Sequence, residues 1–300
     1  MKIRELLQYL KESGESFEFN GDERRDINGF SSLKNYKPGT FTWIKKKASI
    51  PGGMDISKCE LVVTQKNEKI DCQNVIYTDS SKRVFFSLVE FFAESNNVAA
   101  EGNSIGNNTY ISPNCLIGEN VKIGHNCSLD GKIKVGGNSI IGNNVSIKGN
   151  VKIGENAIIE SGVCIGDADL GYVEDADGHR KMLSHYGGVE IGKFVYIGTG
   201  STISRGTIDD TLIGDETSID ALCQVSHNCI LGKKNTLVSG TYLYGSVETG
   251  DNVYIASSVI MNQIKLGDNV TVGMNSVVMS DVGTGLTVFG TPAKAQRKNK

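Results

Sequence analysis

Four histidines, His125, His179, His185 and His227, are the candidates for general acid–base chemistry near neutral pH. His125 and His227 stand at the same place in two short segments, IGHNC and VSHNC, so position alone does not distinguish them. Asp220 precedes His227 by one predicted strand, where its carboxylate could accept the imidazole Nδ1–H and orient the ring. We therefore predict that His227 is a base and leave His125 as a surface residue.

The element that must position these residues is a six-residue repeat. An aliphatic residue occurs at every sixth position from Ile105 to Ile165, and glycine commonly follows it. This period fits neither an α-helix nor an isolated strand, but it fits a coil of three short strands that each point one aliphatic side chain inward. Three hexads form a coil of about 18 residues, so residue n lies beside residue n+18 at roughly 4.8 Å.

The array is interrupted over 167–190, resumes at Ile191, slips in register over 205–211 and slips again near Met261. It ends at Val278. These hexads predict one prism-shaped parallel β-helix of about 180 residues. Polar, glycine-rich excursions of this kind are usually functional loops or tolerated insertions.

The 18-residue spacing predicts a column of three residues. Gly245 follows His227 by one coil, and Gln263 follows Gly245 by another. This arrangement suits acyl transfer from a thioester, because the base takes a proton from an attacking amine while the glycine N–H stabilises the oxyanion. We also expect Asn228, beside His227, and His185, in the interruption, to bind substrate. An acyl-cysteine on Cys229 is disfavoured because this thiol occupies an inward slot of the repeat.

The first third of the chain lacks the repeat and predicts a small α+β domain. We expect helices over 2–13 and 84–93, and strands over 16–20, 26–30, 40–44 and 60–65. Trp43, the only tryptophan, is followed by Lys45, Lys46 and Lys47. A flat aromatic beside ammonium groups could stack on a nucleobase and screen a diphosphate. A core tryptophan beside solvated lysines is the alternative, and the residues alone favour it.

Composition narrows the classes of function. The net charge of −3 and the interspersed acids and bases argue against a nucleic-acid surface. The N-terminus has scattered charges and no continuous apolar core, so we expect neither a signal peptide nor a membrane span, and a cytoplasmic protein. Seven cysteines without a CxxC pair agree with reduced thiols there. The acidic run within 167–190 lacks EF-hand spacing, and we expect no metal site.

Several motifs together resemble a known family. They are RGTIDDTLIGDETSIDALCQVSHNCILG from Arg205, YLYGS, a closing FGTPAK, GDERRDINGFSSLKNYKPGTFTW in the first domain, and HYGGVEIG after the interruption. This set closely resembles UDP-3-O-(3-hydroxyacyl)glucosamine N-acyltransferases. The resemblance implies a left-handed β-helix, a homotrimer with active sites between subunits, and acyl transfer from a carrier thioester to a UDP-linked amino sugar.

The resemblance also implies roles for individual residues. His227 would be the general base, Asp220 its partner and Gly245 the oxyanion donor, while Trp43 would stack on uracil.

Departures from the family's pattern leave the substrates open. Lys46 and Ser49 stand where the family has an asparagine and a tyrosine that contact the nucleotide, and Gln263 stands at its second histidine. Only AQRKNK follows FGTPAK, which makes acyl-coenzyme A an alternative to an acyl-carrier-protein donor.

We therefore predict an N-acyltransferase of lipid A or surface-polysaccharide biosynthesis, which acts on a nucleotide-activated amino sugar with acyl-CoA or acyl carrier protein as donor and no permanently bound cofactor. Its predicted parts are a nucleotide-binding domain at 1–98, a mainly β, left-handed β-helix at 99–290 and a tail at 291–300. Acylation of a lipid A precursor and a non-catalytic sugar-nucleotide-binding β-helix are the alternatives. The sequence leaves open the acyl length, the sugar, UDP against dTDP, and the role of 167–190.

Overall fold

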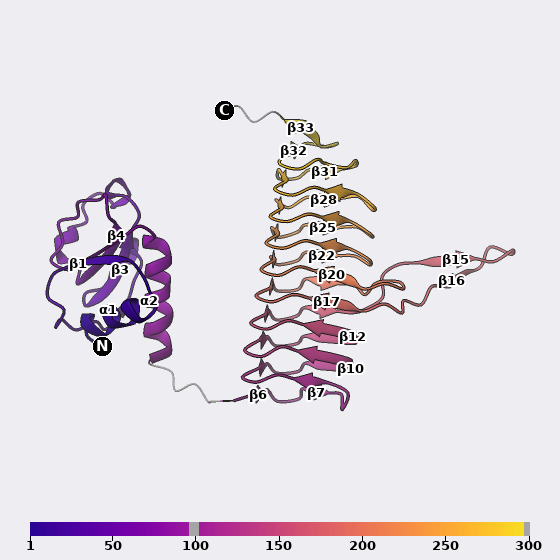
Figure 1. Cartoon of the computed structure of the whole chain (residues 1–300), viewed down its shortest axis with the longest axis horizontal. Helices are drawn as coiled ribbons and strands as arrows, with labels where there is room; N and C mark the ends of the chain where they lie inside the picture. The colour runs from indigo at the N-terminus through magenta and orange to yellow at the C-terminus, as the bar shows by residue number, and fades with distance from the viewer. Residues whose placement is uncertain (96–101, 297–300) are drawn as a thin grey trace. The chain divides into compact units, whose positions relative to one another are not determined.

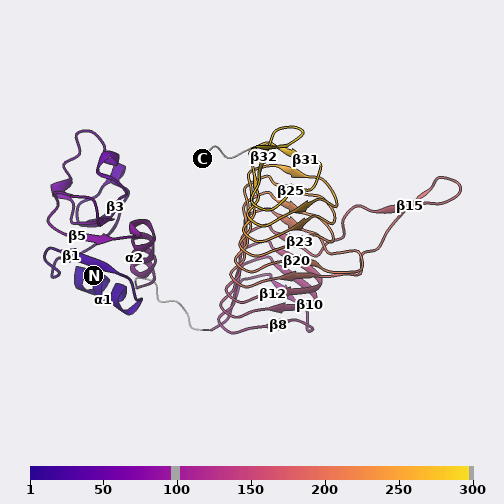
Figure 2. The ribbon, with the colours of Figure 1, turned by 45° about the horizontal axis from the view of Figure 1, so that its top comes forward.

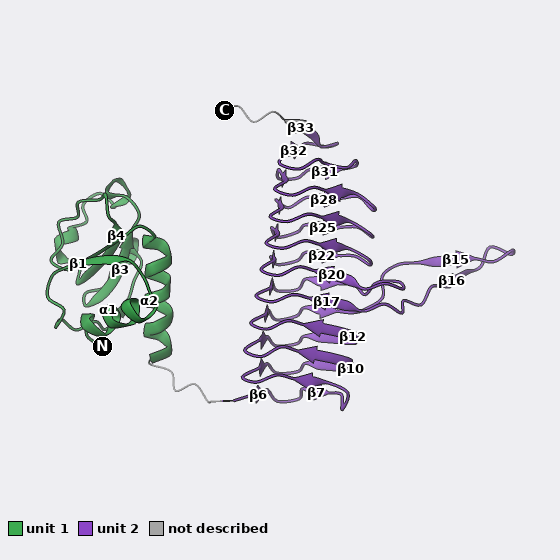
Figure 3. Ribbon diagram, viewed as in Figure 1, with its two compact units in different colours: residues 1–100 green, residues 101–300 purple. Residues whose placement is uncertain are grey.

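The computed structural model describes residues 1–95 and 102–296. The chain divides into two compact units, Met1–Ala100 and Glu101–Lys300 (Figure 3). Most of the segment 94–102, expected to be a linker, lies outside the described residues, and so does the end of the predicted tail, 297–300. Among the residues described, no helix is long and apolar enough to cross a membrane.

The first unit is an α+β module built on a five-stranded sheet of order β1-β5-β4-β3-β2. Its helices and strands are α1 (Ile3–Glu12), β1 (Phe17–Asn20), β2 (Gly29–Phe30), η1 (Leu33–Asn35), β3 (Thr40–Ile44), η2 (Lys47–Ser49), η3 (Ile56–Lys58), β4 (Leu61–Gln65), β5 (Val75–Thr78) and α2 (Ser81–Ser95). The predicted helices and strands are all present within a few residues. Strand β5, whose letters VIYT carry a strand signal, was not predicted.

Helical spacing explains how this unit forms its core. Ile3, Leu6, Leu7 and Leu10 line one face of α1 and are buried. They pack in one cluster with Phe41 and other apolar residues of β3, β4, β5 and α2. The polar face of α1 is left to solvent.

The second unit is the left-handed parallel β-helix that the hexads predict (Figures 1 and 2). Its 11-stranded sheet contains β6 (Ser104–Ile105), β9 (Lys122–Ile123), β11 (Ile140–Ile141), β13 (Ile158–Ile159), β18 (Tyr196–Ile197), β21 (Ser218–Ile219), β24 (Thr236–Leu237), β27 (Tyr254–Ile255), β30 (Thr271–Val272), β32 (Thr287–Phe289) and β33 (Lys294–Gln296). Strand β33 lies in the predicted tail and turns back antiparallel on β32.

A 15-stranded sheet makes up the rest of the prism. Its strands are β7 (Tyr110–Ile111), β8 (Leu116–Ile117), β10 (Ser128–Val135), β12 (Ser146–Ile153), β14 (Cys164–Ile165), β17 (Val189–Ile191), β19 (Thr202–Ile203), β20 (Thr211–Ile213), β22 (Gln224–Val225), β23 (Ile230–Leu231), β25 (Tyr242–Leu243), β26 (Glu248–Thr249), β28 (Val259–Ile260), β29 (Lys265–Leu266) and β31 (Val277–Val278). The inward aliphatic residues of successive coils form one continuous core along the prism.

Three irregularities interrupt the regular coils. The segment 167–188 leaves the prism as an arm whose strands β15 (Tyr172–Glu174) and β16 (Arg180–Met182) form an antiparallel hairpin (Figure 1). Residues 205–210 form a loop that lengthens one coil, since Thr202 pairs with Gln224, 22 residues later. The last irregularity is a shortened corner at 256–258, because Tyr242 pairs with Val259, 17 residues later.

The shortened corner corrects the predicted register. The second slip lies before Ile260, not near Met261, and Ile260 takes the inward position with 0% exposure. Every residue after it is therefore displaced by one position from the n+18 prediction.

Candidate active site

The corners that follow β14, β19, β22, β25 and β28 stack into one column, because these strands pair in that order. His227 lies at the corner after β22, and Gly245 lies at the corner after β25. The arm leaves the column after β14, and the loop 205–210 leaves it after β19. Both large irregularities are thus in the same column as His227.

Gly245 stacks directly on the imidazole of His227. A Cβ atom on Gly245 would lie 2.6 Å from both Cε1 and Nε2 of His227, so only glycine fits there. Within the described part of the chain, the backbone N–H of Gly245 donates no hydrogen bond. The pair that the 18-residue spacing predicts is therefore present, with an unpaired amide beside the Nε2 edge of the ring.

Asp220 does not contact His227 within the chain, and this corrects the predicted pairing. Its carboxylate accepts hydrogen bonds from Ser239 Oγ at 2.5 Å and from the backbone N–H of Ala221 at 2.7 Å. These bonds lower the pKa of Asp220. Asp220 follows β21, whereas His227 follows β22, so the two residues occupy different corners of the prism. His227 Nδ1 instead lies 3.0 Å from Oδ1 of Asn228.

Gln263 is also displaced from its predicted place. With β25 and β28 offset by 17 residues, Asn262 is the residue in register with Gly245. Gln263 instead stacks on Ser246, and its backbone N–H donates to the Gly245 carbonyl at 2.9 Å. The predicted amide side chain in the column is therefore that of Asn262.

The root of the arm brings two further ionisable groups to His227. The rings of His185 and His227 lie 5.6 Å apart, and a carboxylate oxygen of Asp169 accepts from the His227 backbone N–H at 3.3 Å. His185 is 6% exposed, and its Nδ1 is buried without a hydrogen-bond partner among the residues described. The sequence indicated Asp169 only as part of an acidic run, because no local spacing reveals a contact across 58 residues.

His125 has a structural role that separates it from His227. Its Nδ1 accepts the backbone N–H of Asn107 at 2.8 Å, and its own backbone N–H donates to Asn143 at 2.7 Å. It belongs to a ladder of side chains that caps successive corners after β9 and β11. The ring is thus occupied in holding two coils together.

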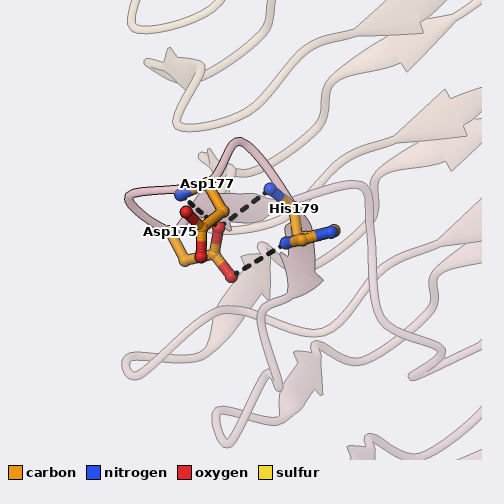
Figure 4. A group of neighbouring side chains, drawn as sticks. All are labelled: Asp175, Asp177 and His179. Atoms are coloured by element: carbon orange, nitrogen blue, oxygen red, sulfur yellow. Dashed lines mark hydrogen bonds and ion pairs between the residues drawn. The ribbon is translucent and has the colours of Figure 1, made fainter.

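The remaining candidates offer little to catalysis. Cys229 is fully buried, and burial raises the pKa of its thiol to about 12, which agrees with the inward slot that disfavours an acyl-cysteine. Asp175, Asp177 and His179 gather at the tip of the arm (Figure 4). There the Asp175 carboxylate accepts the backbone N–H groups of Asp177 and His179, at 3.0 and 2.9 Å, as in a side-chain-capped turn. All three are exposed, and the turn accounts for their proximity.

In the first unit, Trp43 is half-buried at the edge of a pocket of about 450 Å³. Its Nε1–H donates to Ser81 Oγ at 3.0 Å, and its ring stacks on Phe85 at 6.3 Å. Lys45 and Ser49 line this pocket, whereas Lys46, the predicted contact, does not. Trp43 therefore combines the two interpretations, since it packs on the core and also borders a pocket.

Comparisons with known proteins agree with the repeat. The family of bacterial transferase hexapeptides (six repeats) matches residues 100–131 and 132–167. Among solved structures, the UDP-N-acetylglucosamine acyltransferase from Campylobacter jejuni superposes with a TM-score of 0.57 at 26% identity, over 63% of this chain and 72% of that one. The UDP-N-acetylglucosamine O-acyltransferase from Moraxella catarrhalis gives 0.57 and 27% over the same shares. The second unit is therefore a hexapeptide-repeat β-helix of the transferase kind.

Curated relatives carry the more particular likeness. A UDP-3-O-acylglucosamine N-acyltransferase 2 of Rhodopseudomonas palustris is 36% identical over 135 residues, which are 45% of this chain and 36% of that protein. Its namesake in Legionella pneumophila is 37% identical over 155 residues, 45% of each chain. The chain spans less than half the length of these relatives. The resemblance to UDP-3-O-acylglucosamine N-acyltransferases, expected from the motifs, is confirmed.

The burial of His185 generates a prediction about acid stability. Burial and the neighbouring His227 lower the pKa of His185 below its ordinary 6.5, Arg205 adds to this effect, and Asp169 opposes it. Between the lowered pKa and 6.5, the unfolded chain binds more protons than the folded one, so folding stability falls as the pH falls through that window. We expect His185→Gln to weaken this dependence in thermal melts between about pH 7 and about pH 5. His179→Gln, at the exposed tip, should keep the wild-type slope, and an equal slope in His185→Gln would contradict the assignment.

Proposed function

We propose that the protein is an N-acyltransferase that moves an acyl group from a thioester to the amine of a nucleotide-linked amino sugar. The observation that carries this proposal is the pairing of His227 Nε2 with the unpaired N–H of Gly245 across one strand spacing. A non-catalytic scaffold has no need of an imidazole beside a bare amide donor. A thioester is already activated, so the reaction requires no covalent nucleophile of the protein.

The proposed step uses each group once. The amine nitrogen attacks the thioester carbonyl carbon, and His227 Nε2 takes the proton that the amine loses. The carbonyl oxygen becomes an oxyanion, which accepts the N–H of Gly245. When the C–S bond breaks, the imidazolium returns its proton to the departing thiolate. An oxyanion donor of this kind contributes about 3 kcal/mol to the barrier reduction.

The surroundings of His227 support binding of a polar substrate. His185 and Asp169 face the same space from the arm. The lowered pKa of His185 keeps its imidazole neutral near pH 7, so a substrate can use it as a hydrogen-bond partner without charge repulsion with protonated His227. Substrate binding by His185 thus remains part of the proposal.

The names of the relatives support the substrate class. The curated relatives are named for acylation of UDP-3-O-acylglucosamine on nitrogen, and the structural neighbours for acylation of UDP-N-acetylglucosamine. We extend the UDP-linked amino sugar to this chain, with acyl-CoA or acyl carrier protein as donor. A homotrimer and a cytoplasmic location stay predictions from the resemblance and the composition.

The first unit supplies the proposed nucleotide site. The pocket beside Trp43 offers an aromatic edge, an apolar floor that includes Phe85, and the ammonium group of Lys45 at its rim. A nucleobase suits the aromatic and apolar surfaces, and a diphosphate suits the lysine.

Replacement of His227 tests the catalytic proposal. We expect His227→Ala to lower kcat by on the order of 10² to 10⁴, the usual contribution of a general base, because no other described group lies beside Gly245 to take the proton. Thiol release from acyl-CoA and acyl-carrier-protein thioesters, measured with UDP- and dTDP-linked amino sugars, is the assay. His125→Ala is the matched control and should retain the wild-type rate. An unchanged rate in His227→Ala would refute the base assignment, and silence of the wild type with every pair would favour a sugar-nucleotide-binding protein.

Trp43 provides a direct probe of the nucleotide site, because it is the only tryptophan of the chain. We expect UDP to quench its fluorescence on binding beside the ring. Lys45→Met should weaken UDP binding several-fold, since a diphosphate loses one partner worth about 1 kcal/mol. Lys47→Met alters a neighbouring lysine that does not line the pocket and should bind UDP like the wild type. Fluorescence that stays constant up to millimolar UDP would contradict this site.

A further inference from the structure

We propose that Asn228 is a positioning residue that fixes the proton of His227 on Nδ1 and thereby keeps Nε2 free as the base. The proposal rests on the function proposed above and assigns to Asn228 a role other than the substrate contact that the sequence predicts. Its basis is the hydrogen-bond pattern around one amide group, which leaves a single consistent arrangement of protons.

Two backbone contacts determine the orientation of the Asn228 amide. The backbone N–H of Thr207 points to Oδ1 at 3.1 Å, and a backbone N–H can only donate. Nδ2 lies 3.2 Å from the carbonyl oxygen of Asp209, and a carbonyl can only accept. Both contacts require the same orientation, so the assignment of oxygen and nitrogen does not depend on His227.

The orientation of this amide fixes the tautomer of His227. Because Oδ1 of Asn228 is an acceptor only, the 3.0 Å contact with His227 Nδ1 requires that Nδ1 carry the proton. The lone pair of the neutral ring then resides on Nε2, beside Gly245. His125 shows the opposite case, since its Nδ1 accepts the N–H of Asn107 and the proton must reside on Nε2. The two histidines share one hexad position and have opposite tautomers.

The loop 205–210 exists in the structure as the support of this amide. Thr207 donates to Oδ1 through both its backbone N–H and its hydroxyl, the latter at 2.9 Å. The Thr207 carbonyl in turn accepts the backbone N–H of Tyr186 at 2.8 Å, at the root of the arm. The extra residues of this long coil therefore join the arm to Asn228, which gives the register slip a chemical purpose.

The backbone of Asn228 defines the least disruptive replacement. Asn228 has a φ of 58°, in the left-handed region that glycine adopts without strain. Asn144 has a φ of 57° at another corner, and its side chain makes no hydrogen bond among the residues described. Asn228→Gly and Asn144→Gly therefore alter the backbone in the same way, and only the first removes a contact of His227.

The experiment is ¹⁵N NMR of histidine-labelled full-length protein, with the His227 signals identified by their loss in His227→Gln. In the wild type and in Asn144→Gly we expect a protonated Nδ1 and an unprotonated Nε2 on His227. In Asn228→Gly the two nitrogens should approach an average as both tautomers become populated. We expect kcat to fall by roughly 10- to 10³-fold in this variant, with KM little changed, because a wrong tautomer removes the base without removing substrate contacts.

Asn228→Asp provides a second variant with a signature that a merely structural role would not produce. Its carboxylate keeps the acceptor at Nδ1 and favours the imidazolium, so the acid limb of the kcat profile should move to higher pH while much of the rate remains. The other ionisable groups beside His227, namely His185, Asp169 and Arg205, are unchanged in these variants.

An unchanged Nδ1–H signal in Asn228→Gly, or a wild type whose His227 carries its proton on Nε2, would overturn the proposal. So would an Asn228→Asp profile identical to that of the wild type. The NMR result is independent of activity. If the tautomer shifts as expected and no acyl acceptor or donor reacts, the positioning role stands and the proposed function fails.

Discussion

The register between successive coils is the constraint on which the rest of the structure depends. Each coil donates backbone hydrogen bonds to the next, so a residue is held beside one particular residue of the following coil. Columns of side chains at the corners are therefore set by the number of residues per coil. A change of one residue moves every later side chain to another column, as the change from 18 to 17 does for Asn262 and Gln263.

The two large insertions share the column that contains His227. The arm leaves after β14 and the loop 205–210 after β19, so both leave the inward aliphatic positions of the prism undisturbed. Since the core is continuous, polar segments can be added at a corner at little cost in packing. The result is a base that is surrounded by segments distant in sequence, with Asp169 and His185 from the arm and the Thr207 loop behind Asn228.

The hexads predicted the β-helix, its core and the stacking of Gly245 on His227, because a strict repeat converts sequence spacing into spatial position. The same rule failed where the repeat fails. Gln263 was misplaced because the sequence around Ser257 does not show which residue is omitted from the coil. Asp220 was paired with His227 because seven residues look like proximity, whereas a prism places consecutive corners apart. The contacts of Asp169, His185 and Thr207 arise from irregular segments, for which the repeat provides no coordinates.

The central claim is that His227 and the bare amide of Gly245 act as one site. The measurement that tests it most directly is the rate of thiol release by Gly245→Ala compared with Gly283→Ala. The first variant places a methyl group 2.6 Å from His227 Nε2, whereas the second meets no atom nearer than 3.7 Å. The account predicts a loss of on the order of 10² or more in kcat for Gly245→Ala, with a melting temperature close to that of the control. A Gly245→Ala variant that turns over like Gly283→Ala would contradict the account.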